Sequence, residues 1–105
     1  MKHPAEDPLS EFLDSLHEIA INAENKWGRT AQILQTFEEL NEFGDALAKY
    51  SRGRCIREDL TGEFVDLLIM LAQVKYLFSL PDIGIRRNLR YKLTRLREDI
   101  QGDIP

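Results

Sequence analysis

Residues 62–74 read GEFVDLLIMLAQV, and apolar side chains fill nearly every position of this stretch. Such a pattern is typical of a helix that neighbours bury on several sides. Two acids, Glu63 and Asp66, interrupt it near its start. An unpaired carboxylate in a buried helix is costly or becomes neutral, so we expect a compensating feature. That feature is a metal ion, a basic side chain, or a place at the helix start that faces water.

The rest of the chain predicts three more helices around this one. By apolar periodicity the helices run from about Pro8 to Asn25, Thr30 to Tyr50, Asp59 to Leu80 and Ile85 to Ile100. The separating stretches are KWGR, SRGR and SLPDIG, and no segment has the alternation of a strand. The sequence therefore predicts an all-α fold, a four-helix bundle-like domain completed by homo-oligomerisation.

Three of these helices also carry an apolar stripe at helical spacing. The stripes are Phe12, Leu16, Ile19 and Ala23 in the first helix, Ile33, Phe37, Leu40, Gly44 and Leu47 in the second, and Leu89, Leu93 and Leu96 in the fourth.

Length and composition bound the class of protein. The 105 residues fit one domain over residues 1–105, with 1–7 as a flexible N-terminus, and 43% hydrophobic residues allow only a small core. Chains of this size often gain stability by self-association. The net charge of −4 disfavours nucleic acid as a partner, and the single Cys55 indicates a reducing cytoplasm. The apolar run 64–80 contains Gln73 and Lys75 and falls short of a membrane span.

A second stretch, FEELNEFGD at residues 37–45, is rich in carboxylates. Glu39 and Glu42 stand three residues apart on one helix face, and Glu63 and Asp66 repeat this spacing on the next helix. Two such pairs on neighbouring helices can converge on one point, where carboxylate oxygens suit Mg²⁺ or Mn²⁺. The alternative is structural, because acids favour a first helical turn and clustered glutamates often line solvated faces.

The acids carry a family resemblance. EELNE followed by EFVD resembles the EExxE…ExxD signature of the MazG-like, all-α nucleoside triphosphate pyrophosphatases, and the resemblance reaches from Lys26 to Leu96. It implies a homodimer or homotetramer that cleaves nucleoside triphosphates between the α and β phosphates. The Mg²⁺-binding acids that it implies are Glu39, Glu42, Glu63 and Asp66, with Glu38 as a further acid beside them.

Cations and one aromatic side chain are candidates for substrate contacts. Six bases lie between Arg86 and Arg97, and Lys92 and Arg95 loosely match the family's phosphate-binding region. Leu96 stands where the resemblance implies an asparagine. Arg54 belongs to the loop SRGRCIR, which can close over a phosphate tail, and Lys49 can reach the phosphates or a neighbouring carboxylate. Trp27 can stack on a nucleobase. The alternatives are a solvated basic face for the fourth helix and a core or interface anchor for Trp27.

Phosphoanhydride hydrolysis also needs an aligned water molecule. Glu38 or Glu39 is our candidate for orienting or deprotonating it, and Glu38 points further from the third helix. Two other functions stay open. One is a hydrolase similar to phosphoribosyl-ATP pyrophosphatase, and the other is a non-catalytic helical interaction module with a basic fourth helix.

Overall fold

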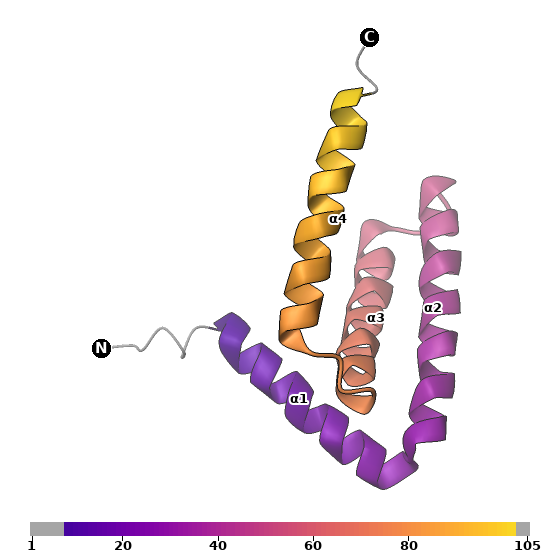
Figure 1. Ribbon diagram of the computed structural model, residues 1–105. Coiled ribbons are helices and arrows are strands. Elements are labelled where there is room, and N and C mark those ends of the chain that lie inside the picture. The colour runs from indigo at the N-terminus through magenta and orange to yellow at the C-terminus, as the bar shows by residue number, and fades with distance from the viewer. Residues whose placement is uncertain (1–7, 103–105) are drawn as a thin grey trace.

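The computed structural model describes residues 8–102, and all the regular structure in that range is helical (Figure 1). The helices are α1 (Pro8–Trp27), α2 (Arg29–Ser51), α3 (Arg57–Leu77) and α4 (Asp82–Gly102). The predicted all-α class is confirmed. The expectation of a flexible N-terminus over residues 1–7 lies outside the described residues. None of the four helices combines the length and the apolar run that crossing a bilayer requires.

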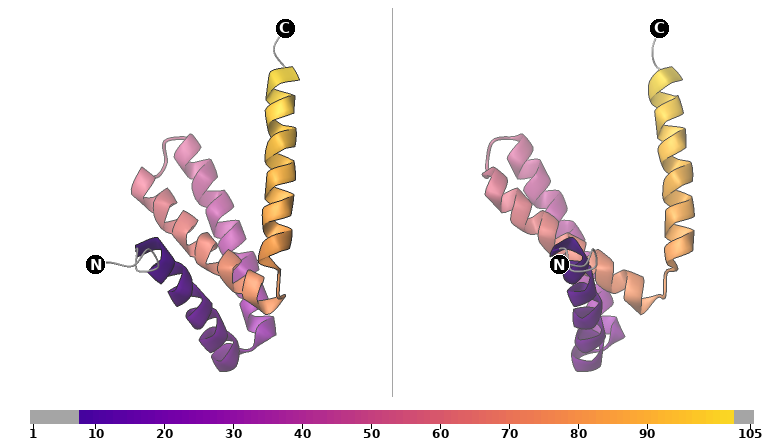
Figure 2. Two further views of the ribbon diagram at one scale, coloured as in Figure 1. Left: turned by 60° about the vertical axis from the view of Figure 1, so that its left-hand side comes forward. Right: turned by 90° about the vertical axis from the view of Figure 1, so that its left-hand side faces the viewer.

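Three of the helices pack together and the fourth stands apart. The helices α2 and α3 run antiparallel, and α1 crosses them, packing mainly against α3. Figure 2 shows α4 leaving the end of α3 and extending away from the other helices. Within one chain α4 packs against none of α1, α2 and α3.

The core lies among α1, α2 and α3 and is small. Its buried apolar residues are Leu16, Ala20 and Ala23 of α1, Ala46 of α2, and Met70 and Leu77 of α3. The polar residues Gln32, Thr36 and Gln73 are also buried. The Thr36 hydroxyl donates a hydrogen bond to the Gln32 carbonyl at 2.9 Å, which satisfies it inside the helix. Of the predicted α1 stripe, Leu16 and Ala23 are buried, whereas Ile19 is exposed; the side chain of Phe12 lies outside the described part.

The predicted stripe of α2 does not face the core of its own chain. Phe37 is 58% exposed, and Leu40 and Leu47 are also exposed, whereas the buried side of α2 carries Gln32 and Thr36. Within one chain, the apolar stripe predicted for α2 is therefore largely uncovered. Periodicity identifies an apolar face, but it does not say which neighbour covers it.

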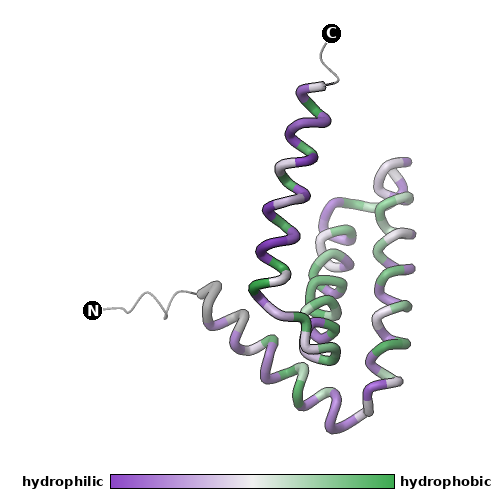
Figure 3. The backbone as a smooth tube through the Cα atoms, in the orientation of Figure 1, coloured by the Kyte–Doolittle hydropathy of each residue, from purple (hydrophilic) through white to green (hydrophobic). Residues whose placement is uncertain are grey.

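The prediction that neighbours bury α3 on several sides is wrong within one chain, and α4 also leaves its apolar stripe uncovered. Hydrophobic residues recur on every turn of α3, and they alternate with hydrophilic residues along α4 (Figure 3). Only one side of α3 is covered, so Phe64, Leu68 and Leu71 are exposed. The α4 stripe is exposed along its whole length because no described helix packs on it.

Glycine and arginine form the junction between α1 and α2. Gly28 has a φ of 87°, which ends α1 as the sequence predicts and lets α2 begin at once. Arg29 then forms an ion pair with Glu24 at 3.5 Å and donates a hydrogen bond to the carbonyl of Leu77 at the end of α3. Its guanidinium also lies 5.2 Å from the ring centre of Phe78. One side chain thus ties the start of α2 to the end of α3.

The α2–α3 link begins with a Schellman motif. Gly53 has a φ of 71°, and its N–H donates to the carbonyl of Tyr50 at 3.0 Å. The N–H of Arg54 donates to the carbonyl of Lys49 at 2.8 Å. This pair of hydrogen bonds satisfies the last carbonyls of α2 and reverses the chain. The carboxylate of Asp59 then accepts the N–H of Ile56 at 3.2 Å where α3 begins.

The α3–α4 link uses the same motif with a serine in place of glycine. Ser79 has a φ of 51°, and the N–H of Leu80 donates to the carbonyl of Lys75 at 3.0 Å. The helix α3 therefore ends at Leu77, three residues before the predicted end. An ion pair between Lys75 and Asp82, at 2.8 Å, spans the link.

Candidate acidic site between α2 and α3

Carboxylates from α2 and α3 meet near the middle of α2. Glu39, Glu63 and Asp66 each offer one carboxylate oxygen, and these three oxygens lie within 4.8 Å of one another. Glu63 and Asp66 are one turn apart on α3, and the antiparallel pairing brings Glu39 of α2 opposite them. The structure thus brings together three of the four acids that the sequence predicts as metal ligands.

Two oxygens of this group have no polar partner among residues 8–102. The Oε2 atoms of Glu39 and Glu63 are buried and accept no hydrogen bond from these described residues. The other oxygen of Glu39, Oε1, accepts a hydrogen bond from Gln35 at 3.0 Å. Among residues 8–102, no lysine or arginine forms an ion pair with these acids. Buried carboxylate oxygens without a donor are costly, and a divalent cation is a partner that would satisfy them.

Glu42 lies beside this group but does not belong to it. Its side chain is exposed, and its pKa is raised above the usual range, mainly by the negative charge of Glu39. Desolvation, Glu63 and Glu38 raise it further, in that order. The negative charge of the cluster therefore acts on Glu42, but the carboxylate oxygens of Glu42 are not part of the cluster.

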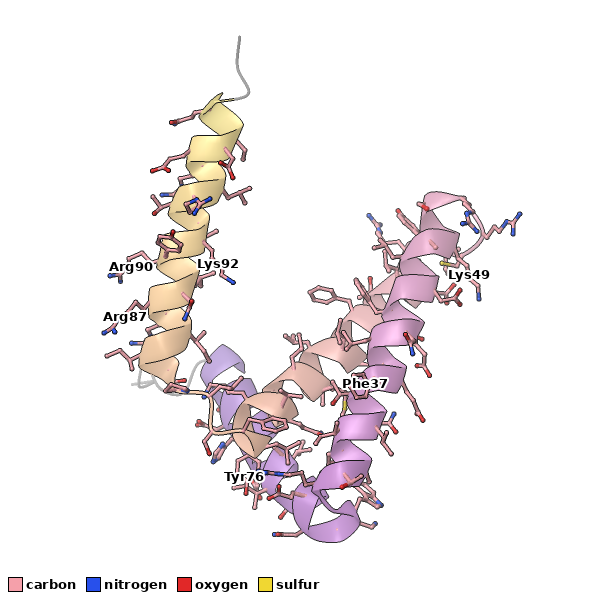
Figure 4. The ribbon with its side chains drawn as sticks, turned by 45° about the vertical axis from the view of Figure 1, so that its right-hand side comes forward. Phe37, Lys49, Tyr76, Arg87, Arg90 and Lys92 are labelled. Atoms are coloured by element: carbon pink, nitrogen blue, oxygen red, sulfur yellow. The ribbon has the colours of Figure 1, made fainter. Side chains whose placement is uncertain are left out.

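A cleft of about 410 Å³ adjoins the acids at the end of the α2–α3 pair. Glu42 and Glu63 line it together with two cations, Lys49 and Arg54. Lys49 forms an ion pair with Asp45 at 2.9 Å, and this hydrogen bond raises the pKa of the lysine. Figure 4 shows Lys49 at the end of α2 where the chain turns into α3. The cleft thus presents carboxylates and cations to the same space.

Three polar residues that line this cleft carry no predicted role: Asp45, Cys55 and Asp59. The acids could have been found from spacing, because Asp59 precedes Glu63 by four residues and Asp45 follows Glu42 by three. The Cys55 thiol donates to the carbonyl of Ala46 at 3.6 Å, and no pattern in the sequence signals that contact.

Four other predicted site residues lie elsewhere. Trp27 is 59% exposed at the corner between α1 and α2 and borders a separate, mainly apolar pocket of about 180 Å³. At 1.5 Å rise per residue, it lies roughly 15 Å or more along α2 from Glu39. Lys92 and Arg95 belong to α4, which does not pack against the α2–α3 pair. Glu38 is exposed on α2, turned about 100° from Glu39, and is not part of the oxygen cluster.

Comparison of the chain with protein-family models, with curated proteins and with solved structures finds no match. The resemblance to the MazG-like pyrophosphatases therefore stays a prediction, supported by the acidic motif and its spacing.

Proposed function

We propose that the chain is a Mg²⁺-dependent nucleotide pyrophosphohydrolase, which cleaves a nucleoside or deoxynucleoside triphosphate to the monophosphate and pyrophosphate. The observation that carries this proposal is the convergence of Glu39, Glu63 and Asp66, with two buried oxygens that accept no hydrogen bond within the described part of the chain. The reaction class comes from the resemblance of EELNE and EFVD to the MazG-like signature.

The donor set suits a hard divalent cation. Three carboxylates from two helices supply only oxygen ligands, which Mg²⁺ and Mn²⁺ prefer. Bound there, the ion would neutralise charge on the phosphate oxygens. Glu39, Glu63 and Asp66 are the residues that would hold it.

Other side chains of this chain would bind the substrate and orient the attacking water. Lys49 and Arg54 line the cleft beside the acids and would bind the negative oxygens of the triphosphate. Glu39 is the better candidate for orienting the attacking water, because it belongs to the carboxylate cluster at which the ion would be held. Glu38 stays the weaker candidate because it lies outside the cluster.

Pyrophosphate release from a panel of nucleotides tests the proposal, with phosphoribosyl-ATP included. Glu39→Gln and Asp66→Asn should each lower kcat by about 100-fold or more, the usual range for a positioned catalytic group. Lys49→Ala and Arg54→Ala should raise KM. Glu18→Gln, on the exposed side of α1, is the matched control and should keep full activity. Unchanged turnover in both acidic variants would remove the mechanism.

A non-catalytic interaction module is the second candidate, and the exposed basic helix α4 favours it. It predicts that neither Mg²⁺ nor a nucleotide stabilises the fold. Thermal melts with and without Mg²⁺ and a non-hydrolysable triphosphate separate the two functions, because a ligand that binds only the folded state raises Tm. An unchanged Tm together with no turnover would favour the module.

A further inference from the structure

An open cleft of about 690 Å³ lies where α1, the end of α3 and the α3–α4 link meet. A cavity of this size accommodates a small organic molecule. The lining residues that decide its chemistry are His17, Lys75, Tyr76, Leu80, Pro81 and Asp82. Tyr76 follows Asp66 by ten residues on α3, so this cleft lies roughly 15 Å along the helix from the acidic cluster. The two sites are therefore separate.

Apolar and aromatic side chains make up much of the lining. The rings of His17 and Tyr76 meet edge to face, with their centres 5.6 Å apart. In Figure 4 Tyr76 lies near the end of α3, where α1 crosses it. Leu16 of α1 and both Leu80 and Pro81 of the link add aliphatic surface. A planar, apolar molecule suits such a lining, because aromatic rings pack edge to face or offset against other rings.

The charged side chains at the link favour a negatively charged ligand. Lys75 and Asp82 both line the cleft, and they form the ion pair that spans the link at 2.8 Å. The hydrogen bond and charge of Lys75, and more weakly the charge of Arg86, hold the pKa of Asp82 below its usual value. Two cations thus accompany one carboxylate at this place. A local surplus of positive charge attracts anions.

The ion pair at the link is weak enough for a ligand to replace one partner. The side chains of Lys75 and Asp82 are 46% and 71% exposed. An ion pair as open to solvent as this one contributes little to stability. An anionic group in the cleft can therefore replace the carboxylate of Asp82 as the acceptor for the Lys75 ammonium.

From this arrangement we propose that the cleft is a binding site for a small aromatic anion. The ring of the anion packs against Tyr76 and the aliphatic side chains, and its carboxylate or phosphate group accepts a hydrogen bond from Lys75 in place of Asp82.

Binding at this site has a consequence for α4. The anion and Asp82 compete for one ammonium group, so binding removes the ion pair that joins the end of α3 to the start of α4. Within the described chain α4 packs against none of the other three helices, so few other contacts hold its direction. The site does not depend on the proposed hydrolase activity.

Nuclear magnetic resonance titration of the isotope-labelled full chain, without divalent cations, tests the site. The probes are naphthoate, naphthyl phosphate and naphthylmethylamine, which carry a carboxylate, a phosphate and an ammonium group on the same rings. Naphthoate should shift the amide signals of Tyr76 and Ser79 saturably and leave those of Glu39 and Glu63 unchanged. The amine should bind this cleft at least about 10-fold more weakly, because it cannot accept a hydrogen bond from Lys75. The ratio of the two anion affinities distinguishes a carboxylate from a phosphate ligand.

Charge substitutions at the link give the decisive comparison. Lys75→Met should weaken naphthoate binding by about 10-fold, and Lys26→Met, in the last turn of α1, is the matched control that should keep the wild-type affinity. Asp82→Asn removes the competing carboxylate and should strengthen binding by roughly threefold or more, whereas Glu98→Gln near the end of α4 should leave it unchanged.

Three results would each overturn the site: no saturable shift at Tyr76 and Ser79, equal naphthoate affinity in Lys75→Met and Lys26→Met, or binding of the amine in this cleft as tight as that of naphthoate. Weaker naphthoate binding by Asp82→Asn than by wild type would overturn the competition for Lys75. Both substituted side chains at the link are exposed, so the variants should fold as the wild type does.

Discussion

Replacing Glu63 by glutamine should stabilise the metal-free protein and abolish its response to Mg²⁺. The substitution removes one of three negative charges whose oxygens lie within 4.8 Å of one another. For an effective dielectric constant between 80 and 20, two unit charges at about 5 Å repel by about 1 to 3 kcal/mol. Because Glu63 and Glu39 are only half-buried, solvent screening favours the lower end. A gain of about 1 kcal/mol corresponds to a rise in Tm of roughly 4–8 °C for a chain of this size.

In the presence of Mg²⁺ the same substitution should instead remove a stabilising contribution. For a dissociation constant on the order of 1 mM, about 10 mM Mg²⁺ contributes about 1.4 kcal/mol to the wild type. Glu63→Gln removes one charged ligand, so Mg²⁺ should leave its Tm unchanged. Scanning calorimetry with and without Mg²⁺ measures both effects, and Glu18→Gln serves as the control that keeps the wild-type response. A Glu63→Gln variant that is less stable than wild type, and that Mg²⁺ stabilises equally, would refute this account of the cluster.

Three further predictions concern the links between helices. Ser79→Gly should raise the free energy of unfolding by about 0.5–1 kcal/mol in urea titrations, because glycine adopts a positive φ without the strain of a side chain; a loss of stability would contradict this. Arg29→Ala should lower it by about 1–2 kcal/mol, since the hydrogen bond to the carbonyl of Leu77 joins α2 to α3; urea midpoints equal to wild type would exclude that role. The hydrogen bond from Lys75 lowers the pKa of Asp82, so this pair stabilises the fold above the ordinary carboxyl pKa and ceases to do so as the pH falls through the lowered value. Lys75→Met should therefore flatten the acid side of the stability–pH curve slightly, and an unchanged curve would show that the pair contributes nothing.

The fold was predictable as far as local patterns reach. Apolar periodicity and glycine positions located four helices to within a few residues, and Gly28 ends α1 as expected. Periodicity could not say which neighbour covers each apolar face. Phe37 and Leu40 belong to the apolar stripe of α2, yet within one chain the structure buries Gln32 and Thr36 on this helix instead.

The sequence likewise predicts one part of the candidate site and not the other. Glu63 and Asp66 lie one turn apart on one helix, and Glu39 needs only the pairing of two consecutive antiparallel helices to reach them, so spacing was sufficient. Whether Lys92 and Trp27 reach this site depends on how α4 and the end of α1 are placed in three dimensions. No local pattern encodes that placement.

The chain reversal at Gly53 has a mechanical consequence for the two cations of the cleft. The backbone N–H of Arg54 and the carbonyl of Lys49 share one hydrogen bond, so a single helix terminus supports both side chains. The backbone positions of both cations are therefore fixed before an anion binds. Binding an anion that contacts both charges then costs less conformational entropy. Lengthening this loop by one residue would uncouple the two supports while leaving every charge in the chain unchanged.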